Sequence, residues 1–276
     1  MPIPIYVFTA TGNSLWVARS LAQRLEDASV VPMVQALGEP RIRPDGERVG
    51  LVFPVYMYRM PHLVADFVSR LETRAPVFVV ATGGGDPGDL FARVGRAFRA
   101  RDLDLAAGLF VVLPSNYLPF GGVPADEELA RVHAAARARV DEIALLLASG
   151  ERRVERDYDR FRAWIHPGIL YGLGHRYAAV SDRKYRLGPT CDGCGVCARV
   201  CPVDNIALDA GRPAWKGRCQ QCMACIQWCP REAIQVEDKT RGERRYHHPE
   251  VRLKDVIAQK AEPPARPAPG LPFGAK

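Results

Sequence analysis

The chain has 276 residues, of which 47% are hydrophobic and 25% are charged. This length and composition are typical of a globular protein with one or two domains, and they exclude fibrous and largely disordered chains. The sequence contains no run of about 18 or more apolar residues that could form a membrane-spanning helix, and its first residues lack the features of a secretory signal. We therefore expect a cytoplasmic protein with no membrane span.

The net charge of +7 is distributed unevenly along the chain. Residues 1–150 contain 15 Arg and no Lys against 16 acidic residues, whereas residues 151–276 contain 23 basic against 15 acidic residues, a net charge of +8. A basic second half favours redox partner proteins with an acidic docking face. Nucleic acid is not expected as a partner, because the Arg-rich stretches at 93–101 and 131–139 are patterned as solvated faces of amphipathic helices.

Apolar runs and helical patterns alternate through the first 150 residues. The apolar runs predict five strands, at residues 3–8, 29–34, 49–55, 76–82 and 105–114. Amphipathic patterns predict helices at residues 15–25, 63–71, 89–100 and 125–149. Continuously apolar strands that alternate with helices are typical of a parallel sheet covered on both faces. Such a sheet binds ligands in the loops at the carboxyl ends of its strands.

The remainder of the chain differs in composition. Residues 151–184 are first charged and then aromatic and Gly-rich, and we interpret them as a tether that packs between two domains. A small cysteine-rich domain is expected over residues 185–258, and its last part predicts a closing strand, a turn and a short helix. The Pro-rich tail at 259–276 is predicted to be disordered.

All eight cysteines lie between residues 191 and 229, in two runs of the pattern C-x2-C-x2-C-x3-C-P. The runs start 28 residues apart and form an internal repeat. This is the spacing of bacterial ferredoxins, in which three cysteines of one run and the fourth of the other hold one [4Fe–4S] cluster. Zinc in CxxC pairs is the alternative, which fits this spacing poorly. The predicted ligands are Cys191, Cys194, Cys197 and Cys229 for cluster 1, and Cys219, Cys222, Cys225 and Cys201 for cluster 2.

The sequence TATGNS follows the first predicted strand. Its hydroxyl side chains and backbone amides face the start of a helix, which is a favourable site for an anion. The loop lacks the Lys of a nucleotide-triphosphate P-loop and the G-x-G-x-x-G of a dinucleotide fold. It therefore predicts a site for a terminal monophosphate, with a plain helix cap as the alternative. The residues concerned are Thr9, Ala10, Thr11, Gly12, Asn13 and Ser14.

The TATGNS loop resembles the FMN phosphate loop of flavodoxins, and the alternation of strands and helices fits the flavodoxin strand order 2-1-3-4-5. Because two ferredoxin-type runs follow, the chain resembles the flavodoxin–ferredoxin fusion family over about residues 1–258. Segments 53–67, 115–120 and 245–255 also resemble that family. The resemblance implies an α/β flavodoxin-like domain with a doubly wound, five-stranded parallel sheet at residues 1–150, followed by a small α+β dicluster ferredoxin-like domain. The implied cofactors are FMN and two [4Fe–4S] clusters.

The resemblance also implies further loops around the flavin. Tyr56 is expected to stack on the isoalloxazine ring, with Tyr58 as the alternative. Many flavodoxins carry a glycine in this loop, whose peptide bonds the reduced ring, but residues 56–60 contain none. We hypothesise that Arg59 instead adds positive charge near the ring. The expected flavin contacts outside the phosphate loop are Tyr56, Met57, Tyr58, Gly83, Gly84, Gly85, Asp86, Asn116 and Tyr117.

Three functions are compatible with these motifs. The leading interpretation is an intracellular electron-transfer protein that relays low-potential electrons between the clusters and FMN, and so couples one- and two-electron steps. The alternative is a flavin-dependent reductase of a small substrate, with the clusters as an internal wire. A redox sensor is the third, but no effector or DNA-binding domain supports it. We expect one of the two clusters, and not both, to face the flavin.

Overall fold

A computed structural model describes residues 2–155 and 177–260. Residues 156–176 of the predicted tether and residues 261–276 of the predicted disordered tail lie outside the described residues. The first part contains these elements in chain order: β1 (Ile3–Val7), α1 (Asn13–Ala22), β2 (Ala28–Pro32), α2 (Met33–Ala36), β3 (Val49–Pro54), α3 (His62–Arg70), β4 (Val77–Gly83), α4 (Leu90–Arg99), β5 (Leu105–Val112), η1 (Leu118–Phe120), α5 (Asp126–Ser149) and β6 (Arg153–Val154).

The strands form one six-stranded parallel sheet in the order β2-β1-β3-β4-β5-β6. The five apolar runs therefore become strands in the predicted order 2-1-3-4-5. The prediction of only five strands was wrong, because β6 adds a sixth beside β5. This edge strand has only two residues, one of them charged, so it presents no apolar run in the sequence. Its continuation at Glu155 is bonded to β5, where the Glu155 side chain accepts a hydrogen bond from Phe110 N at 2.9 Å.

The end of the second strand also differs from the prediction. Met33 and Val34, which were expected to end that strand, instead begin the short helix α2. Pro32, the last residue of β2, has no N–H with which to continue a sheet ladder, and its φ of −66° suits the position just before a helix. The chain therefore leaves the sheet at this proline.

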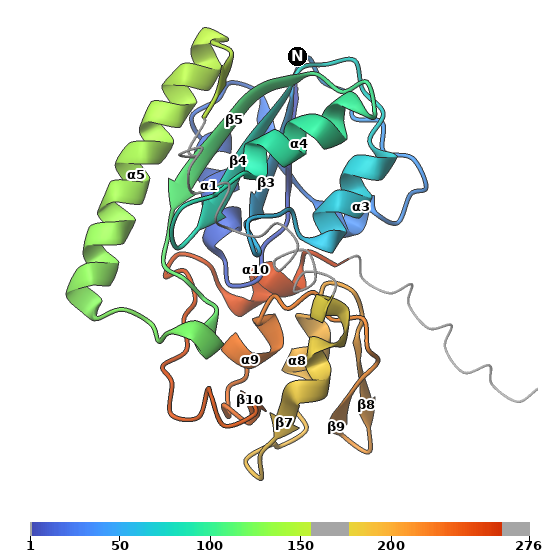
Figure 1. Ribbon diagram of the computed structural model, residues 1–276, viewed down its shortest axis with the longest axis vertical. Helices are drawn as coiled ribbons and strands as arrows, with labels where there is room; N and C mark the ends of the chain where they lie inside the picture. The colour runs from blue at the N-terminus through green and yellow to red at the C-terminus, as the bar shows by residue number, and fades with distance from the viewer. Residues whose placement is uncertain (1, 156–176, 261–276) are drawn as a thin grey trace, which may run out of the picture.

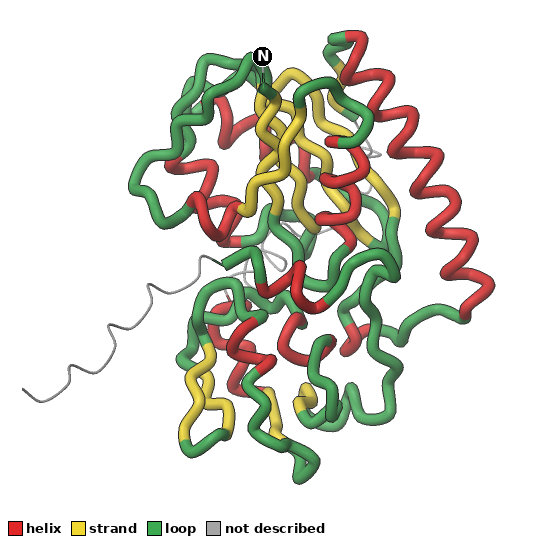
Figure 2. The backbone as a smooth tube through the Cα atoms, turned by 180° about the vertical axis from the view of Figure 1, so that it is seen from behind, coloured by secondary structure: helices red, strands yellow, loops and turns green. Residues whose placement is uncertain are grey.

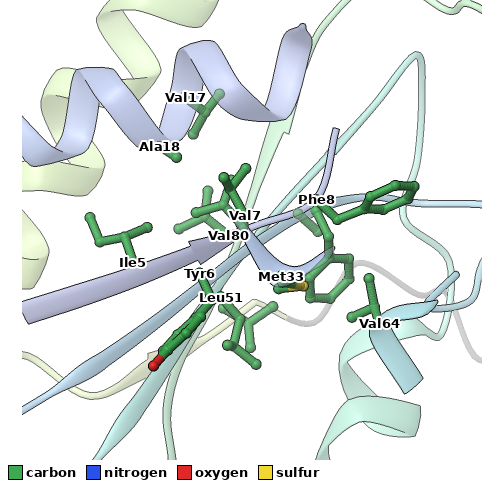
Figure 3. Close-up of a cluster of buried hydrophobic side chains, with 14 of the residues drawn as sticks. Ile5, Tyr6, Val7, Phe8, Val17, Ala18, Met33, Leu51, Val64 and Val80 are labelled. Atoms are coloured by element: carbon green, nitrogen blue, oxygen red, sulfur yellow. The ribbon is translucent and has the colours of Figure 1, made fainter. Parts of the chain in front are cut away.

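Helices cover both faces of the sheet, as expected for a doubly wound α/β fold. In Figure 1, α5 lies on one side of the strands and α3 and α4 lie on the other. Side chains along β1 point alternately to the two faces of the sheet. In Figure 3, Val17 and Ala18 of α1 lie on one side of the strands, and Val64 of α3 lies on the other. On the α3 side, the Tyr6 ring packs against the Phe67 ring with their centroids 4.9 Å apart.

The second part consists mostly of loops with short regular elements (Figure 2). Its two sheets each contain two antiparallel strands, β7 with β10 and β8 with β9. The 28-residue repeat of the sequence is visible in the fold, because α9 follows α8 at that offset. The elements are η2 (Ala178–Lys184), β7 (Tyr185–Leu187), α8 (Val196–Arg199), β8 (Ile206–Asp209), β9 (Arg212–Trp215), α9 (Ala224–Gln227), β10 (Ile234–Val236) and α10 (Leu253–Ile257).

The two parts are joined by a shared apolar core. The short helix α10 lies between the sheet and the elements α8 and α9 (Figure 1). Val251 and Val256, from the last described segment, and Trp228, next to a cysteine run, belong to the same buried cluster as the strands. Among the helices of the described residues, none is both long enough and apolar enough to cross a membrane.

Candidate functional site

A pocket of about 480 Å³ lies at the carboxyl ends of the central strands, a volume typical of small-molecule and cofactor sites. The loops that follow β1, β3, β4 and β5 supply almost all of its lining, as expected for a doubly wound sheet. Of the residues predicted to contact FMN, only Gly12 is absent from this lining. The structure brings together Thr9, Ala10, Thr11, Asn13, Ser14, Tyr56, Met57, Tyr58, Gly83, Gly84, Gly85, Asp86, Asn116 and Tyr117.

The loop between β1 and α1 is organised around its own hydroxyl groups. Gly12 N donates a hydrogen bond to Thr9 Oγ1 at 3.1 Å, and Asn116 Nδ2 donates to Thr11 Oγ1 at 2.9 Å. Thr9 and Thr11 are almost completely buried. Gly12 itself has a φ of +103°, a left-handed value that glycine adopts at little cost. The hydroxyls are therefore held in place at the N-terminus of a ten-residue helix, where an anion is favoured.

The pocket offers neutral donors to an anion. Ser14 Oγ lies 2.9 Å from Thr82 Oγ1 in the floor of the pocket. Among the described residues that line it, Asp86 is the only charged one, and its carboxylate accepts a hydrogen bond from Gly88 N at 2.6 Å. A phosphate bound here would meet hydroxyls, amides and a helix N-terminus rather than Lys or Arg.

The stretch Tyr56–Arg59 forms a tight turn at one wall of the pocket. Tyr56 and Arg59 exchange two backbone hydrogen bonds of 3.0 Å, and the two residues between them, Met57 and Tyr58, have φ values of +51° and +59°. Left-handed backbone at both central positions usually favours Gly or Asn, so this glycine-free turn is strained. The Tyr58 ring packs so closely over Gly88 that a Cβ there would lie 2.4 Å from Tyr58 Cδ1.

Tyr56 lies between the pocket and the cysteine-rich part. Its ring meets the Phe8 ring edge to face, with centroids 6.4 Å apart. Its hydroxyl is buried and has no hydrogen-bond partner among the described residues. Burial raises the pKa of this phenol well above its usual value, and the nearby Cys222 and Cys219 raise it further. Arg59 is not part of the pocket lining. Burial and the charge of Arg93 lower the pKa of its guanidinium.

The glycine loop after β4 approaches the loop after β5 closely. A Cβ on Gly84 would lie 2.7 Å from the Cβ of Ser115, so no larger residue fits there without displacing the neighbouring loop. Nothing lies within 4 Å of the corresponding position on Gly85. The close approach places the two predicted flavin-contacting loops side by side along one wall of the pocket.

Two further cavities lie in the second part, and four cysteines line each of them. The first cavity is lined by Cys191, Cys194, Cys197 and Cys229, and the second by Cys201, Cys219, Cys222 and Cys225. We call these the outer set and the inner set. Each set contains three cysteines of one run and the fourth of the other, which is the grouping predicted from the sequence. None of the eight cysteines forms a disulfide.

The donor sets fit the chemistry of iron–sulfur clusters. Backbone amides donate hydrogen bonds to cysteine sulfurs in both sets, from Gln221 N to Cys219 Sγ at 3.2 Å and from Ala233 N to Cys229 Sγ at 3.3 Å. Such bonds favour the thiolate that binds metal. Among the described residues, no three or more His, Cys, Asp or Glu are grouped to hold a single metal ion.

Burial dominates the acidity of these thiols. Burial, with smaller contributions from the other three members of the outer set, raises the pKa of Cys197 to about 11. Burial likewise raises the pKa of Cys201, Cys222 and Cys225 in the inner set. Metal binding to either set would therefore release protons, because thiolate is the ligand form.

Among the described residues that line the pocket, one comes from the cysteine-rich part, and it neighbours the inner set. Gln221, which stands between two inner cysteines in the sequence, lines the pocket and donates a hydrogen bond through Nε2 to the Tyr117 hydroxyl at 2.9 Å. Burial raises the pKa of Tyr117, and Cys219 raises it further. In the outer set, by contrast, Cys194 is exposed to solvent. The two sets are thus placed differently, one beside the pocket and one at the surface.

Sequence reasoning missed the residues that connect the two parts. They include Gln221, Gln227, Trp228, Tyr246 and Gln259. Trp228 lies within the second cysteine run, and Tyr246 lies within segment 245–255, which resembles the fusion family. No sequence pattern marks the three glutamines. Gln259 bonds to a residue 250 positions away, so no local signal could identify it.

Comparisons with known proteins add little to this geometry. No protein-family model matches the chain, and no curated protein sequence matches it. Among solved structures, the Trp repressor binding protein from Bacillus subtilis is similar, with 16% sequence identity and a TM-score of 0.33 over 50% of this chain and 98% of that one. The fold class rests on the observed sheet, which defines the first part as a doubly wound α/β fold.

Proposed function

We propose that this protein is an electron carrier that holds two [4Fe–4S] clusters and one FMN. The observation that carries the proposal is the grouping of the cysteines into two sets, each with three members from one run and one from the other. Two-cluster ferredoxins share their ligands between runs in this way. When bound, the clusters transfer single electrons and the flavin stores one or two.

The pocket supports FMN as the third group. The hydroxyls of Thr9, Thr11 and Ser14 and the N-terminus of α1 would hold its phosphate. Tyr56 and Tyr58 would form one wall at the ring, and the Gly84–Gly85 loop would supply backbone groups to its polar edge. These residues bind and orient the cofactor, and none of them is arranged with a neighbouring base as a nucleophile.

The placement of the two cysteine sets supports an order of transfer. The inner set lies beside the pocket, next to Gln221 and Tyr56. The outer set reaches the surface at Cys194, which is exposed. We therefore propose that partner proteins exchange electrons at the outer set, and that the inner set connects it to the flavin.

Metal and flavin analysis of the reconstituted full chain is the first test. We expect about eight iron atoms and one FMN per chain. Zinc in place of iron would refute the cluster assignment, and an absence of bound FMN would refute the flavin assignment. In the variant Cys194→Ser the signal of the outer cluster should change while the signal of the inner cluster stays the same.

Anaerobic reduction then separates the carrier from the alternative reductase. The full chain is mixed with NADH and with NADPH, and the flavin and cluster absorbance is followed before and after a ferredoxin reductase is added. A carrier stays oxidised until the reductase is present. Rapid bleaching by the nucleotide alone would favour an enzyme that accepts hydride at its flavin.

A further inference from the structure

The loop predicted to bind phosphate is held from the second part of the chain. The Gln259 side chain makes two hydrogen bonds to the backbone of Thr9, accepting from Thr9 N at 3.0 Å and donating to Thr9 O at 3.1 Å. The indole Nε1 of Trp228 donates to Ala10 O at 2.9 Å. All of these contacts are buried. Two successive carbonyl groups of the loop are thus bound by side chains that lie more than two hundred residues downstream.

The following residues of the loop are held in the same way. His248 N donates to Thr11 O at 2.9 Å, and the Tyr246 hydroxyl donates to Asn13 Oδ1 at 2.8 Å. Gly12 lies so close to the C-terminal segment that a Cβ on it would be 2.7 Å from the Cβ of Val251. Each residue from Thr9 to Asn13 therefore contacts the second part.

These bonds determine which way the peptide groups of the loop face. In a trans peptide, the carbonyl of one residue and the N–H of the next point in opposite directions. Because Gln259 and Trp228 bind the carbonyls of Thr9 and Ala10, the N–H groups of Ala10 and Thr11 are turned away from the second part. Both residues line the pocket. The downstream side chains therefore preorient amides that an anion in the pocket would use.

Trp228 also connects the loop to the outer cysteine set. It is almost completely buried and stacks on the His247 ring with centroids 3.7 Å apart. Its neighbour Gln227 donates through Nε2 to Asn116 O at 2.7 Å, and Asn116 lines the pocket. Its other neighbour is Cys229 of the outer set. Three consecutive residues thus contact the pocket wall, the phosphate loop and the outer cavity.

We infer that Trp228 and Gln259 are positioning residues of the flavin phosphate site, and that metal assembly at the outer set and binding of the flavin phosphate stabilise each other. This inference rests on the proposed function. Assembly at Cys229 orders its neighbour Trp228 and so holds the loop ready for phosphate. The coupling is reciprocal, because two ligands that order one element each lower the cost of the other.

The first test compares FMN with riboflavin, which has the same ring but no phosphate. Dissociation constants are measured by flavin fluorescence quenching in the anaerobic, cluster-loaded full chain. In Trp228→Phe, which keeps the aromatic stack and removes the N–H donor, we expect FMN to bind about tenfold more weakly and riboflavin to bind as before. The matched control is Trp215→Phe, because Trp215 Nε1 is buried and has no hydrogen-bond partner among the described residues. That variant should bind both flavins as the unmodified chain does.

Gln259→Leu is the second variant, and it decides the outcome if Trp228→Phe loses its clusters. Gln259 lies 30 residues beyond Cys229, so its replacement leaves the cysteine runs intact. A selective loss of FMN affinity in Gln259→Leu supports the inference. Unchanged FMN affinity in both variants with full iron content would overturn it. If the unmodified chain bound neither flavin, the proposed function would fail instead.

The coupling is tested by the release of iron to a chelator. In the unmodified chain, FMN should slow iron release more than riboflavin does. In Trp228→Phe that difference should disappear, because the link between the loop and Cys229 is cut. Equal protection by FMN and riboflavin in the unmodified chain would contradict the coupling.

Discussion

His248 makes the attachment of the C-terminal segment sensitive to acid. Its side chain stacks on the Trp16 ring of α1 at 4.7 Å and meets the His133 ring of α5 edge to face at 4.8 Å. Only 1% of the residue is exposed. Burial, with smaller contributions from the neighbouring His133 and Arg137, lowers the pKa of this imidazole to about 3. Glu250 lies on the same segment, where its N–H donates to His248 Nδ1 at 3.3 Å.

Acid lowers the stability of the folded protein because His248 binds a proton more readily in the unfolded chain than in the folded one. An imidazole in the unfolded chain has a pKa of about 6.5, whereas folded His248 stays neutral until far lower pH. Acid therefore stabilises the unfolded chain, and stability is lost as the pH falls from about 6.5 towards 3. One pH unit below the unfolded value the loss is about 1.4 kcal/mol. The loss of about 1.4 kcal/mol is the same for any pKa of folded His248 that lies well below 5.

Urea unfolding of the full chain at pH 7.5 and 5.5 measures this loss. The variant His248→Phe keeps an aromatic ring on Trp16 but cannot take up a proton. Between the two pH values, the free energy of unfolding should fall by about 1.4 kcal/mol more in the unmodified chain than in the variant. His133, whose pKa burial also lowers, is present in both proteins and cancels in the difference. An equal fall in both proteins would refute the assignment to His248.

Four other substitutions test the packing of the pocket loops and of the sheet edge. Gly12→Ala places a Cβ at a φ of +103° and 2.7 Å from the Cβ of Val251, and should lower the free energy of unfolding in urea by about 3 kcal/mol. Gly85→Ala is the matched control, because nothing lies within 4 Å of its Cβ, and should lower that free energy by less than about 0.5 kcal/mol. Glu155→Gln weakens the attachment of β6 and should cost about 1 to 2 kcal/mol, so an unchanged melting temperature would contradict that role. Tyr56→Phe removes a buried hydroxyl that has no partner among the described residues, and should stabilise the flavin-free chain by about 1 kcal/mol; a lower melting temperature would show that the hydroxyl is satisfied.

The central strands could be predicted because buried parallel strands require continuous apolar runs. Edge elements were harder: β6 takes its place through two backbone pairs with β5 and the Glu155 side chain, and neither leaves an apolar pattern. The proline that ends β2 was visible in the sequence, but the helix after it depends on local geometry. The strand order 2-1-3-4-5 was predicted from the resemblance to flavodoxins, and the alternation of strands and helices alone did not fix it.

In the candidate site, too, some features could be predicted from the sequence and others could not. Loops that follow strands meet at one edge of the sheet, so Thr11, Tyr56 and Gly84 could be placed together before any coordinates were known. The cysteine sets were also predictable, because the repeat pairs each run with the last cysteine of the other. The contacts of Trp228 and Gln259 were not, because they are isolated hydrogen bonds between distant segments and leave no periodic trace.

The inner cysteine set is attached to the first part on two sides. Gln220 Oε1 accepts a hydrogen bond from Leu63 N at the start of α3, at 3.0 Å, and Gln221 Nε2 donates to the hydroxyl of Tyr117, which lines the pocket. Neighbouring residues thus hold the second cysteine run against both α3 and the loop after β5. The outer set instead presents Cys194 to solvent. A molecule that docks at the outer set therefore need not displace the inner set, so the placement of the inner set beside the pocket can stay constant.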